Sequence, residues 1–145
     1  MAERGREQGH DGALPANRLV PCQSYHEHSA YIIRNTEIPG ISPEQRRIAA
    51  LVARYHRKDP PGMLHQDYAI LPAADRERVN KLAAILRIAC ALGSMAASPG
   101  NLRVKIEPGQ VTVRLGDDIS FFPETMNDVD TTYFSSVYAC RIRFA

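Results

Sequence analysis

The chain has 145 residues, 44% of them hydrophobic and 23% charged, and its formal net charge is +2. A chain of this length has room for one domain with a hydrophobic core, because such domains bury roughly 70% of the surface that the unfolded chain exposes. Its three cysteines lack CxxC spacing, which argues against a disulfide framework and a zinc knuckle. No long apolar run is present, which argues against a membrane span. We therefore expect a cytoplasmic protein.

The start of the chain shows little sign of regular structure. Residues 1–24 contain three glycines and two prolines and no sustained apolar periodicity, which predicts a flexible arm. Residues 25–35 are compatible with a helix that ends before Pro39 and Gly40.

A second helix has a clearer beginning. Ser42 is a suitable N-cap, Pro43 suits the first helical position, and Gln45 can complete a capping box. Apolar residues at helical spacing follow as far as Tyr55, and the prolines and glycine of residues 60–62 end the helix.

Residues 63–71 are predicted to form a connecting loop. The segment after Pro72 is rich in alanine and keeps helical spacing, which predicts a long helix at the centre of a bundle.

The last third of the chain has the pattern of strands. Apolar and polar residues alternate on both sides of Pro108 and Gly109, as in a β-hairpin. We expect a short strand over residues 119–122, helical turns over residues 130–138, and an edge strand over Arg141–Phe144. The prediction is an α+β fold, mainly helical, in which a helical domain over residues 25–97 and an antiparallel β-rich segment over residues 98–145 form one compact unit.

Several separated sequence segments resemble those of a known family. They are HEHSAYIIRN (residues 26–35), PGIS (39–42), ALVARYHRK (50–58) and DRERVNKLAAILRIACAL (75–92). In this order they resemble the C-terminal HD-type helical domain of the exopolyphosphatase / guanosine pentaphosphate phosphohydrolase (Ppx/GppA) family. The resemblance implies an HD-like helical bundle. The actin-like phosphatase region that precedes this domain in such enzymes has no counterpart in the sequence, so no catalytic residue is assigned.

The resemblance also implies candidate metal ligands. HD-type centres hold a divalent metal with histidine and aspartate side chains from separate helices. The matching residues are His10, Asp11, His28 and His56. His26 and His28 are two residues apart on one helix, so at most one of them points inward, and the HxHS word assigns the role to His28. Cys90 stands where the family has an aspartate, and a lone cysteine in an alanine-rich helix is more often an apolar filler, so the centre looks degenerate.

Cationic side chains suggest a phosphate-binding surface. Residues 42–87 carry nine Lys and Arg residues against five Asp and Glu residues. The candidate phosphate-binding residues form two groups: Arg54, His56, Arg57 and Lys58 at the end of one helix, and Arg76, Arg78 and Lys81 near the beginning of the long one. Guanidinium groups match phosphate oxygens well, but such residues also pair with carboxylates such as Asp75 and Glu77 on a solvated face.

The sequence leaves three functions open. The leading one is a stand-alone module that binds polyphosphate or guanosine penta- or tetraphosphate, needs no cofactor, and lacks a complete catalytic centre. It would act as a homodimer or beside a separate catalytic chain. The second is a metal-dependent HD-type phosphohydrolase, and the third is an interaction module that dimerises through Arg141–Phe144. A membrane partner is not expected, nor is nucleic acid, because no aromatic residues interleave with the cations.

Overall fold

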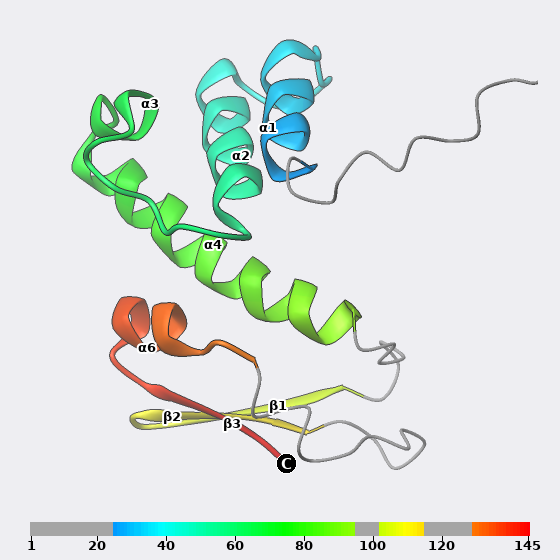
Figure 1. Cartoon of the computed structure of the whole chain (residues 1–145), viewed down its shortest axis with the longest axis vertical. Coiled ribbons are helices and arrows are strands. Elements are labelled where there is room, and N and C mark those ends of the chain that lie inside the picture. The colour runs from blue at the N-terminus through cyan, green and yellow to red at the C-terminus, as the bar shows by residue number, and fades with distance from the viewer. Residues whose placement is uncertain (1–24, 95–101, 115–128) are drawn as a thin grey trace, which may run out of the picture.

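The computed structural model describes residues 25–94, 102–114 and 129–145 (Figure 1). In chain order the elements are α1 (Tyr25–Asn35), α2 (Pro43–Tyr55), α3 (Gln66–Ala69), α4 (Ala73–Ser94), β1 (Arg103–Glu107), β2 (Gln110–Arg114), α6 (Thr132–Tyr138) and β3 (Arg141–Phe144). The α+β class is therefore confirmed. The predicted arm, the strand over residues 119–122, and the candidate ligands His10 and Asp11 lie outside the described residues.

The predicted capping box forms at the beginning of α2. Ser42 Oγ accepts a hydrogen bond from the backbone N–H of Gln45 at 3.2 Å, and the Gln45 side chain accepts one from the backbone N–H of Ser42 at 2.9 Å. These two bonds satisfy N–H groups that have no partner within the helix.

Helices α1 and α2 lie side by side, and α4 crosses below them (Figure 1). One core cluster fills the junction of α2, α3 and α4; its buried members are Leu51, Tyr55, Tyr68, Leu71, Val79 and Ala83. The one-turn helix α3 falls within the predicted loop over residues 63–71, so that prediction is wrong there. An ion pair of 2.8 Å between Arg34 of α1 and Asp67 of α3 also links these elements.

The long helix α4 separates this helical pair from the sheet. Its residues Ala84, Ile88 and Leu92 belong to a second core cluster, together with residues of β2 and α6. Val79 and Ala83 of the same helix face the first cluster. Helix α4 therefore contributes to both core clusters.

The three-stranded sheet has the order β1-β2-β3. Strands β1 and β2 form the predicted antiparallel hairpin, with Val104 opposite Val113, and Gly109 has a φ of +74°, which the turn requires. Strand β3, however, pairs with β2 in parallel, so the expectation of an antiparallel segment is wrong for this strand. Parallel neighbours need a long crossover, and residues 115–140, which include α6, supply it.

Candidate phosphate-binding surface

The C-terminal end of α2 is held by an arginine from α4. Arg87 Nη1 donates to the carbonyl of Tyr55 at 3.1 Å, and Nη2 donates to the carbonyl of Lys58 at 2.6 Å. The guanidinium carbon also lies 5.3 Å from the centroid of the Tyr133 ring. The last carbonyls of a helix have no partner within it, so Arg87 supplies a cap. Its donors are directed at the protein rather than at a ligand.

The chain turns sharply at this cap. Lys58 has a φ of +57°, in the left-handed region that favours glycine. The side chains of Arg57 and Lys58 are exposed, and Arg54 is half-buried with its guanidinium carbon 5.9 Å from the Tyr55 ring centroid. Within residues 25–94, 102–114 and 129–145, none of these three cations forms an ion pair.

His56, the C-cap residue of α2, completes this group. Its Nδ1–H donates to the backbone carbonyl of Ala53, since a carbonyl oxygen can only accept. Nε2 is therefore the ring nitrogen that His56 can offer to a ligand.

The neighbouring helix α1 adds a histidine that the sequence did not single out. His26 is only 7% exposed, whereas His28 is exposed, so the histidine that points inward is His26. The role of His28 as a metal ligand stays a prediction. Burial lowers the pKa of His26, and the positive charge of Lys58 lowers it further; Glu27 opposes them, and His56 and Arg54 add to the lowering. His26 therefore lies within electrostatic range of the end of α2. We call His26, Arg54, His56, Arg57 and Lys58 the α2-end cluster.

The second predicted group of cations is engaged elsewhere. Arg78 pairs with Asp75 at 3.0 Å, and Lys81 pairs with Glu77 at 2.6 Å. Arg76 Nη1 donates to the backbone carbonyl of Ala69 at 3.1 Å, at the end of α3. These contacts match the solvated face that the sequence offered as the alternative.

The two predicted groups also lie on different sides of α4. Arg78 precedes Arg87 by nine residues, which turns it about 180° around the helix axis from the side that contacts α2. The backbone carbonyl of Lys81 accepts a hydrogen bond of 3.2 Å from Tyr138 of α6, so Lys81 belongs to the side that faces α6. The structure therefore does not gather both groups on one surface.

The candidate metal ligands are placed only in part. Within the described ranges, no three His, Cys, Asp or Glu side chains lie close enough together to hold a metal ion. Cys90 is a half-buried free thiol on α4.

Among the helices described, none is both long and apolar enough to cross a membrane.

The environment of His26 predicts a pH dependence of stability. Its pKa is lowered in the folded protein, so the unfolded chain, with a pKa near 6.5, binds the proton more tightly. The free energy of unfolding should thus decrease as the pH falls below about 6.5 and level off below the folded pKa. Urea unfolding at several pH values should show this decrease in the wild type and a smaller one in His26→Gln. An NMR titration that placed the pKa of His26 above 6.5 would contradict the prediction.

Comparison with known proteins identifies the family of this chain. Residues 18–107 match the model of the Ppx/GppA phosphatase, domain III, which covers more than half of the chain. A stretch of 74 residues is 36% identical to a guanosine-5'-triphosphate,3'-diphosphate pyrophosphatase of Pseudoalteromonas translucida (strain TAC 125). That stretch covers 51% of this chain and 14% of the relative, so the chain spans a small part of the relative's length. The chain therefore belongs to the Ppx/GppA phosphatase family.

Proposed function

We propose that this chain binds linear polyphosphate or guanosine penta- or tetraphosphate at the α2-end cluster, without a complete catalytic centre of its own. The observation that carries the proposal is that the cations at the end of α2 have no carboxylate partner among the described residues, and that Arg57 and Lys58 are exposed. Family membership supports the choice of a phosphate compound, since the relative is named for such a substrate. We further propose that residues 25–97 form an HD-like bundle with residues 98–145 packed on it as one unit.

Exposed arginine and lysine side chains suit a polyanion. Arg57 can contact phosphate oxygens with two parallel N–H groups, whereas Lys58 acts as a point charge. Several such contacts along one chain of phosphates give an affinity that falls steeply with salt. Arg78 and Lys81 should contribute less, because their carboxylate partners compete with the ligand.

A purely structural role for these cations is the main rival explanation. Positive charges near the carbonyl end of a helix stabilise it by about 0.3–1 kcal/mol each. Arg87 already donates to two carbonyls at this end, and the side chains of Arg57 and Lys58 remain exposed. A binding measurement separates the two roles.

The test compares two double variants with the same change in charge and residue type. Arg57→Gln/Lys58→Gln should weaken polyphosphate binding and lower the slope of log affinity against log salt by about one for each cation that no longer neutralises a phosphate. Arg78→Gln/Lys81→Gln should change binding little. Equal weakening in both variants, or none in the first, would refute the proposed surface. Guanosine tetraphosphate in place of polyphosphate tests the second ligand class.

Two further readouts locate the ligand and check for hydrolysis. A bound polyanion near Lys58 should raise the pKa of His26, so binding should take up a proton and become tighter as the pH falls. Metal-dependent hydrolysis through His10, Asp11, His28 and His56 would appear as released phosphate and as a bound metal that is absent from His28→Ala. Protein purified without a histidine tag is needed for that measurement.

A further inference from the structure

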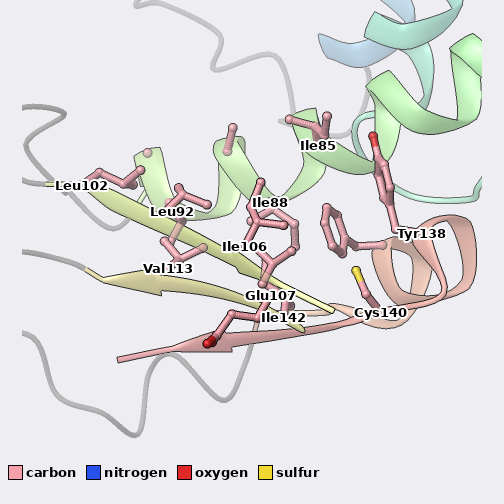
Figure 2. A pocket seen from close by; sticks show the side chains of 15 residues that line it. Ile85, Ile88, Leu92, Leu102, Ile106, Glu107, Val113, Tyr138, Cys140 and Ile142 are labelled. Atoms are coloured by element: carbon pink, nitrogen blue, oxygen red, sulfur yellow. The ribbon is translucent and has the colours of Figure 1, made fainter. Parts of the chain in front are cut away.

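An apolar groove lies between α4 and the sheet, on the far side of α4 from α2. Its volume is about 680 Å³, and aliphatic side chains of α4 and β1 form much of its lining. Figure 2 shows Ile88 and Leu92 of α4 facing the sheet, with Leu102 and Ile106 at the β1 side. Ile85 of α4 also lines the groove. Ile106 is 79% exposed and Val104 is 54% exposed, although both are typical core residues of strands.

Strand β1, which lines the groove, has an outer edge without a partner strand in the described ranges. Strand β1 is the first strand of the sheet, and among the described residues no strand pairs with its outer side. The two-residue turn at residues 108–109 makes Glu107 and Gln110 a hydrogen-bonded pair, so Val104 and Ile106 direct their backbone N–H and C=O groups outward. Apolar side chains and unpaired backbone groups together form a surface that another strand can cover.

We propose that the occupant is a second copy of this chain, paired antiparallel through β1 about a two-fold axis at Lys105. In this register Val104 of each copy lies opposite Ile106 of the other copy. Both pairs are hydrogen-bonded through their backbone groups. Residues opposite each other have their side chains on the same face of the sheet, so the apolar faces of the two sheets join into one. The groove of each copy lies on this joined face.

Charge favours the same register. It places Arg103 of each copy opposite Glu107 of the other, so two opposite-charge pairs form across the axis. Within its own hairpin Arg103 lies opposite Arg114, and no ion pair of Arg103 occurs in the described part of the chain. The second copy thus offers Arg103 a carboxylate, which would be shared with Lys105 of its own chain.

The two neighbouring registers create less favourable residue pairs than the proposed one. An axis at Ile106 would place Val104 opposite Pro108, which has no N–H for the ladder. An axis at Val104 would place Arg103 opposite Lys105. The proposed register does place the Lys105 residues of the two copies opposite each other. Each Lys105, however, forms an ion pair of 2.9 Å with Glu107 of its own chain.

The other edge of the sheet fits a second copy less well. Strand β3 has the sequence RIRF, so antiparallel self-pairing would bring four arginines together without a carboxylate on the strand. This moves the expected interface from Arg141–Phe144, which the sequence suggested, to β1.

A charge-swap cycle tests the interface in the full chain. Sedimentation equilibrium over a wide concentration range should show a dimer whose Kd rises about tenfold in Arg103→Glu and in Glu107→Arg, and returns toward the wild-type value in the double variant. Arg141→Glu on β3 is the control and should leave the Kd unchanged.

Neither substitution should destabilise the fold much. Arg103→Glu replaces a like-charge pair with Arg114 by an opposite-charge one, and Glu107→Arg removes only an exposed ion pair with Lys105. A variant that keeps its unfolding midpoint at low protein concentration but no longer dimerises supports the proposal. A monomer at all concentrations, a dimer abolished only in Arg141→Glu, or single swaps that the double variant does not rescue would overturn it.

Discussion

Replacing Tyr55 with alanine is expected to lower the free energy of unfolding by about 3–5 kcal/mol, which is the usual cost of removing a buried aromatic ring. Tyr55 is 2% exposed and lies where α2, α3 and α4 meet. Its ring stacks on His65 with centroids 5.5 Å apart and meets the edge of Tyr68 at 6.1 Å. The cavity left by alanine would remove the packing of the ring between all three helices. Urea unfolding followed by circular dichroism measures the change.

Tyr55→Phe is the matched control for this experiment. It keeps the ring and removes only the hydroxyl, which forms a hydrogen bond of 2.9 Å with His65 Nδ1. Since His65 is half-buried and water can replace this partner, the expected decrease is about 1 kcal/mol. Similar decreases in the two variants would show that the hydrogen bond, rather than the packing of the ring, holds this junction.

Replacing Arg87 with methionine is expected to lower the free energy of unfolding by about 2–3 kcal/mol. The change removes two charge-assisted hydrogen bonds to the end of α2 and the interaction with the Tyr133 ring, but it keeps an unbranched apolar stem. Burial raises the pKa of Tyr133 to about 12, so the ring beside Arg87 stays neutral at ordinary pH. The measurement is again urea unfolding, with Arg78→Met as the control.

Arg78→Met should change stability little, because the pair with Asp75 is a surface ion pair and Arg78 is 68% exposed. Hydrogen exchange gives a second, local readout. Amides just after α2 should exchange faster in Arg87→Met than its decrease in global stability explains, since the carbonyl of Lys58 no longer has its partner. Equal destabilisation by both methionine variants would contradict the capping role of Arg87.

The parts of the fold that could be predicted are those with local signals. Ser42, Pro43 and Gln45 specify the beginning of α2 through their own backbone and side-chain bonds. Pro108 and Gly109 specify the hairpin turn in the same way. The parallel pairing of β3 has no such signal, because the partner of a strand depends on where the crossover returns it. Helix α3 is too short to show an apolar period.

The same distinction applies to the candidate site. The spacing of His26 and His28 shows that only one can point inward, but the rotation of α1 against α2 decides which one, and this is a tertiary property. The pairs of Arg78 and Lys81 follow from carboxylates three and four residues away, so the sequence could offer them as an alternative. The role of Arg87 depends on a partner about thirty residues away along the chain, and no pattern of spacing reveals it.

The left-handed residue after α2 has an evolutionary consequence. An L-residue with a side chain gives up roughly 1–2 kcal/mol in this conformation, which glycine would avoid while keeping the same carbonyl in place for Arg87. A chain optimised for heat resistance alone would therefore have glycine at position 58. Under the proposed function, Lys58 keeps a positive charge at the expense of conformational energy, so family members without the anion site should be the ones in which glycine or asparagine has replaced it.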